Sequence, residues 1–397
     1  MSLPLENIRV LDFTRALSGP WGTMMLSDLG AEILKVEHPT TGDEAREYGP
    51  PFIEGESSYF MMFNRNKKSV TIDIRLPEGR QMMHDLARQV DVLIHNFRPP
   101  FVQKHGLAYD VLEEINPALV YCWITGFGGS GPYEELLGYD LTVMGIGGAM
   151  SMTGEPGRPP IKSAISYGDI LGGYNAAVGI LAALVARQET GRGQKIDINL
   201  LDGVVATTAS PMSFYFATGS PPPRNAPDIG AMWSPAGTYP TSDGYINFDA
   251  SRQNKFPLLC QVLGLEHLIT DPRFAQREER VANRLELRPI LEDRLETRTT
   301  DEWLPLIRAQ GIAAGPVQTL DQVAQDPQVL HNKMIVEVKH PRCGPIRLLG
   351  TPVHFADQPN VSYQPPPTLG QHTEDVLKEY LGLDDQAIAV LRARKVI

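Results

Sequence analysis

The chain has 397 residues, of which 42% are hydrophobic and 21% are charged. This length predicts two or three domains, and the composition is that of a globular protein rather than a disordered one. The formal net charge of -11 argues against non-specific nucleic-acid binding, so an anionic ligand would need a local cluster of Lys and Arg.

Strands and helices alternate through the first half of the chain. We predict strands over 8–13, 31–37, 69–74, 90–97 and 118–127, and helices that end near 29, 64 and 89. This alternation implies a parallel sheet in a doubly wound α/β domain, which binds ligands at the carboxyl ends of its strands. Gly19 and Gly22 do not complete a G-x-G-x-x-G pattern, which argues against a dinucleotide site.

The central stretch 164–202 has the most informative pattern. A turn over 166–169 precedes an apolar helix predicted over about 170–187, and Gly191 and Gly193 separate this helix from a strand over 194–200. Asp169 therefore stands at a helix start, where unpaired N–H groups and the helix dipole orient a carboxylate and favour its ionised form. Two interpretations remain open, namely a plain helix cap and a carboxylate nucleophile.

Basic residues gather near the ends of the predicted strands. They are Lys67, Lys68, Arg75, Arg98 and Lys104. They form either an ordinary solvated surface or a cationic rim for a phosphorylated ligand at the ligand-binding edge of the sheet.

The second half of the chain changes character after Pro221–Pro223, where a turn-rich run marks a boundary. A strand pair is predicted within 237–249, followed by helices rich in Arg and Glu, which together indicate a smaller α+β domain. Strands over 334–338 and 346–349, a proline-rich extended arm over 359–367 and a helix over 373–381 complete the chain.

No targeting or metal-binding pattern is visible. The N-terminal residues lack a basic region followed by an apolar core, and the apolar run 176–186 is shorter than the roughly 20 residues of a membrane span. Cys122, Cys260 and Cys343 lack metal or disulfide spacing. We expect a cytoplasmic protein without metal, membrane or nucleic-acid partners.

Segments along nearly the whole chain match one family in order and spacing. They are VLDFTRALSGP (10–20), LGAEILKVEHPTTGDEAR (29–46), NRNKKSVTIDIRLPEG (64–79), VDVLIHNFRP (90–99), ITGFGGSGPY (124–133), GYD (138–140), GDILGG (168–173), TGRGQKIDINLLD (190–202) and GQHTEDVL (370–377). The chain resembles the class III CoA-transferases of the CaiB/BaiF type, which include formyl-CoA:oxalate and carnitine CoA-transferases.

The resemblance implies an architecture and a reaction. It implies a Rossmann-like large domain whose first part is 1–220, a linker and small α+β domain over 221–325, and a return to the large domain over 326–397. Two such chains would form an interlocked homodimer. Asp169 would be the nucleophile, acyl-CoA and a carboxylic acid the substrates, and no cofactor beyond CoA would be needed.

The resemblance also assigns CoA contacts, residue by residue. They are Ala16, Leu17, His38, Ile72, Asp73, Ile74, Arg75, Asn96, Phe97, Arg98, Lys104, Tyr139 and Asp140. His38 stands where formyl-CoA transferases carry an Arg, so its pairing with phosphate is in doubt. Asp140 is either a hydrogen-bonding group near the thioester or a local Asx turn.

Several alternatives stay open at this point. The same fold serves α-methylacyl-CoA racemases, which carry a His base where this chain has Tyr139, and a phenol with its usual pKa of about 10 is a poor base. A non-catalytic CoA-binding protein is a further alternative. Oxyanion donors are expected at Gly128 and Gly129 or at the turn 243–244.

The acceptor is expected to be a small dicarboxylate such as succinate. Residues 247–255, NFDASRQNK, do not reproduce the glycine-rich loop of formyl-CoA transferases, which argues against oxalate. Arg15 or Arg252 would pair with the remote carboxylate.

Overall fold

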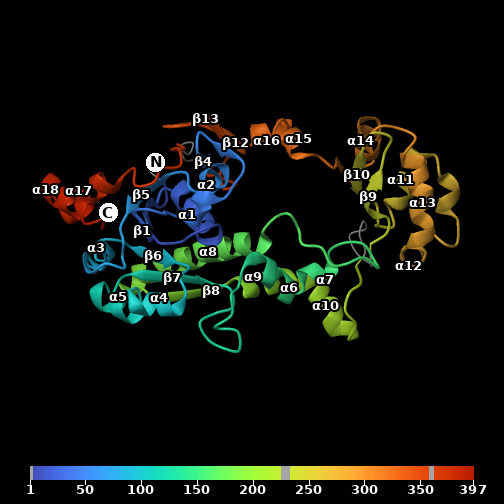
Figure 1. Cartoon of the computed structure of the whole chain (residues 1–397). Coiled ribbons are helices and arrows are strands. Elements are labelled where there is room, and N and C mark those ends of the chain that lie inside the picture. Colours follow the sequence, from blue (N-terminus) through green and yellow to red (C-terminus); the bar gives the residue numbers. More distant parts are fainter. Residues whose placement is uncertain (1–2, 225–232, 357–361) are drawn as a thin grey trace. The chain divides into compact units, whose positions relative to one another are not determined.

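The computed structural model describes residues 3–224, 233–356 and 362–397 (Figure 1). The chain forms two compact units. The first contains Met1–Gly147, Ala164–Thr207 and Pro327–Ile397, and the second contains Gly148–Ser163 and Thr208–Asp326. Parts of the predicted turn-rich run after 223 and of the proline-rich arm, residues 225–232 and 357–361, lie outside the described residues.

A six-stranded parallel sheet forms the centre of the first unit. Its strands are β1 (Arg9–Asp12), β2 (Glu32–Glu37), β5 (Lys67–Thr71), β6 (Val92–His95), β7 (Val120–Thr125) and β8 (Lys195–Asn199). Their order is β5-β2-β1-β6-β7-β8, and every neighbouring pair is parallel. The predicted mixed α/β fold with a large parallel sheet is confirmed, and the order is that of a doubly wound sheet with its switch point between β1 and β6.

Helices cover this sheet on both faces. In the first unit they are α1 (Ser18–Asp28), α2 (Ser58–Phe63), α3 (Pro77–Ala87), α4 (Pro99–Lys104), α5 (Tyr109–Ile115), α6 (Asp140–Ile146), α8 (Tyr167–Thr190), α9 (Leu200–Thr207), α16 (Pro327–His331), α17 (Thr373–Leu381) and α18 (Asp385–Ala393). The short strands β3 (Phe52–Ile53) and β4 (Glu56–Ser57) form one hairpin, and β12 (Ile335–His340) and β13 (Gly344–Leu349) form another.

Residues from both ends of the chain share one hydrophobic core. Leu11 of β1 and Leu34 of β2 belong to the same buried cluster as Val376 and Leu377 of α17. Figure 1 accordingly shows α17 beside β5 and α3, although more than 280 residues separate α17 from α3 in sequence. The C-terminal helices therefore help to fix the loops at the edge of the sheet.

Helix α8 is longer than the sequence predicted. It begins at Tyr167 rather than at 170, and it ends at Thr190 because Gly191 adopts a left-handed conformation at its C-cap. By length and apolarity α8 could cross a membrane, a test that core helices of soluble proteins also pass. Helix α8 lies beside α1 (Figure 1), and its buried Gly172 and Gly173 face Ser18 of α1.

The second unit has a small sheet and its own core. The antiparallel strands β9 (Ala236–Pro240), β10 (Tyr245–Asp249) and β11 (Ala313–Pro316) lie in the order β11-β10-β9. The helices are α7 (Ala149–Met152), α10 (Ala209–Thr218), α11 (Phe256–Leu263), α12 (Arg277–Ala282), α13 (Arg284–Leu295), α14 (Thr300–Ala309) and α15 (Leu320–Val323). The buried Trp303 is the largest side chain of its core. The sequence analysis missed β11, a four-residue segment of Ala, Gly and Pro without strand-like alternation.

Candidate active site

The residues assigned by resemblance follow five neighbouring strands. Residues 16–17 come after β1, His38 after β2, 72–75 after β5, 96–98 after β6, and 139–140 after the loop that leaves β7. Because the strands are parallel, these segments all leave the same edge of the sheet. The predicted strand 69–74 is displaced to Lys67–Thr71, which leaves 72–75 free to form a turn at that edge.

Asp169 lies inside the first turn of α8, and the cap comes from another helix. The N-cap residue Ser166 makes no side-chain cap hydrogen bond. Instead, Oδ1 of Asp140 in α6 accepts hydrogen bonds from the N–H groups of Gly168 and Asp169, at 2.8 and 3.4 Å. Asp169 is therefore not the N-cap residue of α8, and Asp140 does not form a purely local turn.

Glycines explain how α8 comes close to its neighbours. A Cβ atom at Gly168 would lie 2.8 Å from Val143 of α6, and one at Gly173 would lie 2.4 Å from the backbone oxygen of Ser18 in α1. The glycines of the segment GDILGG (168–173) thus leave parts of the helix face around Asp169 without side chains, so that neighbouring helices can approach closely. This close approach fixes the beginning of α8 against the start of α1, which follows the loop between β1 and α1.

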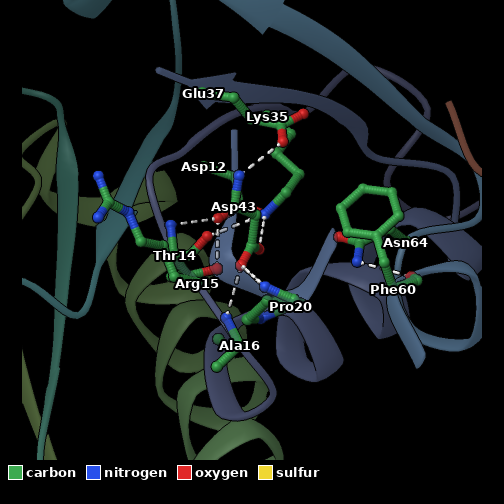
Figure 2. A network of polar contacts seen from close by, with 12 residues as sticks. Asp12, Thr14, Arg15, Ala16, Pro20, Lys35, Glu37, Asp43, Phe60 and Asn64 are labelled. Carbon is green, nitrogen blue, oxygen red and sulfur yellow. Dashed lines mark hydrogen bonds and ion pairs between the residues drawn. The ribbon is translucent and has the colours of Figure 1, made fainter. Parts of the chain in front are cut away.

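A buried ion pair supports that loop (Figure 2). Oδ1 of Asp43 accepts a hydrogen bond from the Ala16 N–H at 3.0 Å, and its Oδ2 lies 2.8 Å from Nζ of Lys35. Ala16 has a positive φ of 64°, a conformation that costs a non-glycine residue free energy. Although burial raises it, the pKa of Asp43 is lowered overall by Lys35 and by backbone N–H groups. Asp43 therefore holds Ala16 in its unusual conformation.

The turn after β6 is tied to the same loop. The Asn96 side chain accepts from the Arg15 N–H and donates to the Arg15 carbonyl oxygen, both at 3.0 Å. The Arg15 guanidinium lies 4.9 Å from the centre of the Phe97 ring. Two of the assigned CoA-binding segments, 16–17 and 96–98, are thus joined directly.

A second cluster links the turns after β2 and β5. Asp73 binds the Arg75 guanidinium through both carboxylate oxygens, each at 2.8 Å, and the Asp73 N–H donates to the Val396 carbonyl oxygen at 2.7 Å. His38 contacts Arg75 and lies 3.6 Å from Asp73. Burial and Arg75 lower the pKa of His38. At neutral pH His38 is therefore mainly uncharged, whereas the half-exposed Arg75 carries a positive charge that Asp73 pairs.

Lys104 is the last residue of the short helix α4, and His105 follows it. Burial, followed by Lys104, Arg80 and Arg75, lowers the pKa of His105. Two residues of the predicted cationic rim are corrected, whereas Arg98 stands in the turn between β6 and α4 as expected. Lys67 is buried against Asp12 and Pro20, and Lys68 pairs with Glu32. Both lie at the start of β5, away from the carboxyl edge.

Sequence reasoning missed two partly buried tyrosines, Tyr59 and Tyr48. Burial and then Asp169 raise the pKa of Tyr59. The Tyr59 ring is 5.3 Å from that of Tyr48, whose pKa is raised to about 12 by burial, Glu44 and Asp43. Both phenols stay protonated at neutral pH and can donate hydrogen bonds. Their sequence signal was weak, since Tyr59 falls in an aromatic helix that reads as core.

Polar groups in both predicted oxyanion segments make local hydrogen bonds. The Gly128 N–H already donates to the Thr125 hydroxyl at 2.8 Å. In the second unit, Asp243 accepts from the N–H of Thr300, the first residue of α14, at 2.8 Å. Both arrangements give these segments a local structural role.

The chain is similar to known proteins over nearly its whole length. The family model described as CoA-transferase family III matches residues 5–373. Succinyl-CoA:glutarate CoA-transferase of Homo sapiens is 38% identical over 394 residues, which are 99% of this chain and 90% of that protein. Succinyl-CoA–D-citramalate CoA-transferase of Chloroflexus aurantiacus is 35% identical over 395 residues, covering 99% and 98%. A CAIB/BAIF family protein from Brucella suis has a crystal structure that matches with a TM-score of 0.86 and 38% identity, covering 96% of this chain and 100% of that one.

Proposed function

The chain belongs to CoA-transferase family III and is a CoA-transferase, and from this premise we propose that it exchanges CoA between two small dicarboxylates through a thioester on Asp169. The main support is the position of the Asp169 carboxylate in the first turn of α8, whose N–H groups Asp140 caps. The substrate class rests on the relatives, which are named for succinyl-CoA, glutarate and D-citramalate.

The proposed reaction conserves atoms and charge at each step. The Asp169 carboxylate attacks the thioester carbonyl of the donor, the C–S bond breaks, and a mixed anhydride and CoA thiolate form. The thiolate attacks the aspartyl carbonyl, the donor acid leaves as its carboxylate, and an aspartyl-CoA thioester remains. The acceptor carboxylate reverses both steps, so acceptor-CoA leaves and Asp169 is regenerated. Covalent catalysis divides one difficult exchange into easier steps.

The assigned contacts have distinct roles in this scheme. Arg75 and Lys104 would meet phosphates of CoA, the former as a planar fork and the latter as a point charge. Residues 16–17 and the turn 96–98 would hold the remainder of CoA. Tyr59 would donate a hydrogen bond beside Asp169. Arg15 is the candidate of the first unit for the remote carboxylate of the substrate, and Arg252 belongs to the second unit.

The racemase alternative is less well supported. Racemisation needs two bases that face the α-carbon, and the residue before Asp140 is Tyr139 rather than His. The Tyr139 side chain is 69% exposed, so burial does little to prepare it for proton transfer. Exchange of the α-proton with deuterated water in the absence of a second acid would support the racemase instead.

We further propose an interlocked cytoplasmic homodimer. Val178 and Val185 lie on one side of α8 and are 64% and 65% exposed. Exposed apolar patches mark contact surfaces, and a second copy would cover them. Light scattering of the purified protein would give the mass, and cell fractionation would give the compartment. A monomeric mass would refute the homodimer.

The covalent step can be tested by mass spectrometry. The wild-type protein is incubated with succinyl-CoA and digested, and the peptide that contains Asp169 is examined before and after hydroxylamine. We expect a CoA thioester on that peptide, removed by hydroxylamine and absent in Asp169→Asn. Transfer by the Asp169→Asn variant at the wild-type rate would refute the proposal.

A further inference from the structure

Trp123 in β7 lies between two loops of the proposed site, and no step above uses it. Its indole N–H donates a hydrogen bond to the Phe97 carbonyl oxygen at 2.9 Å, although Phe97 follows the neighbouring strand β6. The Trp123 residue is 9% exposed. One backbone polar group of the assigned CoA-binding turn 96–98 is therefore held by a side chain from another strand.

The second backbone group of Phe97 is held as well. Its N–H donates to Nδ1 of His95 at 3.2 Å, and the His95 ring stacks on Trp123 with a centroid separation of 6.1 Å. Burial and then Lys195 lower the pKa of His95 to about 3, so the imidazole is neutral and Nδ1 can accept. The other nitrogen then donates to the Tyr121 hydroxyl at 2.5 Å, and Tyr121 donates to the Leu107 carbonyl oxygen.

The indole ring also contacts the glycine-rich loop after β7. A Cβ atom at Gly129 would lie 2.5 Å from Cζ3 of Trp123. The backbone of this loop therefore packs directly against the indole ring. The Gly128 N–H, bound to Thr125, fixes the start of the same loop. Only glycine permits this approach, because any side chain at 129 would push either the loop or the indole away.

We propose that Trp123 is a positioning residue that holds the CoA-binding turn 96–98 in register with the glycine-rich loop 126–132. This inference rests on the proposed role of that turn in CoA binding. Trp123 acts on both loops at once, because its N–H binds one backbone while its ring supports the other. Its loss should weaken CoA binding more than it slows the chemical steps on Asp169.

The test compares two identical substitutions. Trp123→Phe removes the hydrogen bond to Phe97 and keeps an aromatic ring. Trp303→Phe is the matched control, since the buried Trp303 of the second unit donates to the Leu295 carbonyl oxygen at 2.8 Å. We expect similar losses of thermal stability in the two variants. Only Trp123→Phe should raise KM for acyl-CoA and the calorimetric Kd of free CoA, by about tenfold, with kcat and KM for the acceptor acid little changed.

A double-mutant cycle with Gly129→Ala gives a second measurement, and its Gly129→Ala single variant keeps the proposal testable if Trp123→Phe folds poorly. Gly129→Ala should raise KM for acyl-CoA in the wild-type background and have a smaller effect in the Trp123→Phe background, because a phenyl ring leaves more room for the added methyl group. Equal KM values for the Trp123→Phe and Trp303→Phe variants would overturn the proposal.

Phe97→Ala separates the two levels of inference. If this variant leaves CoA binding unchanged, the assignment of the turn 96–98 fails and the positioning role fails with it. If it weakens CoA binding while Trp123→Phe does not, only the positioning role of Trp123 fails.

Discussion

The contact between α1 and α8 makes a sharp prediction for Gly173→Ala. The added methyl group would lie 2.4 Å from the Ser18 carbonyl oxygen and 3.0 Å from the Gly22 nitrogen, where ordinary contact begins at 3.4 Å. Both neighbours are backbone atoms of α1 and cannot rotate away, so the helices must separate by about 1 Å. Overpacking of this kind costs about 1–3 kcal/mol, and the better helix propensity of Ala offsets about 1 kcal/mol.

The expected net result is a loss of up to about 2 kcal/mol of unfolding free energy. The catalytic effect should be larger. Asp169 lies one turn before Gly173, and a displacement of about 1 Å at a reacting group can lower kcat about 100-fold. Urea unfolding and steady-state transfer from succinyl-CoA to glutarate would measure the two effects separately.

Gly179→Ala in the same helix is the control. Its methyl group would meet only the ends of two side chains, Ile196 at 3.1 Å and Ile198 at 3.7 Å, which can move aside. We expect unchanged kcat and equal or higher stability, by up to about 1 kcal/mol. If Gly173→Ala has the same kcat as Gly179→Ala, the close approach of α1 does not position Asp169 and the reasoning is wrong.

Three further predictions concern residues around the site. Asp140→Ala should lower the unfolding free energy by about 1–2 kcal/mol through the lost cap. Asp140→Asn retains an acceptor oxygen for the Gly168 N–H and should recover most of this stability in thermal unfolding. Equal losses in the two variants would contradict the capping role. Asp43→Asn removes the carboxylate that the buried Lys35 binds directly, while Asp12 and Glu37 still attract it, and should cost about 3 kcal/mol at neutral pH, the lower end for a broken buried pair. The pKa of Asp43 is lowered from 3.8 in the folded state, so the wild-type advantage is present above pH 3.8 and must shrink as the pH falls below it; an advantage independent of pH would refute this. Lys104→Ala should raise KM for acyl-CoA in steady-state assays and leave the unfolding free energy within about 0.5 kcal/mol, and an unchanged KM would remove Lys104 from the site.

Local patterns determined the elements of this protein well. The βαβ alternation predicted the parallel sheet because strands of Val, Ile and Leu alternate with helices. The helix over 373–381 was predicted with its observed bounds, Thr373–Leu381. The family motifs identified the chain as a CoA-transferase, because they specify which residue types occupy each loop. Asp169 stands out by its place at a helix start, a feature that the local sequence alone reveals.

The sequence could not determine which distant groups meet. Asp140 caps α8 from another helix, Asp43 holds Ala16, and Val396 accepts from the Asp73 N–H. Periodicity reports only whether a residue faces the core, so Lys67 was expected at a solvated rim although it is buried beside Asp12. These contacts depend on the strand order, which brings five loops to one edge of the sheet. Local sequence therefore determined the elements and pointed to Asp169 as the candidate nucleophile, and only the tertiary structure decided which side chains hold its helix and the neighbouring loops in place.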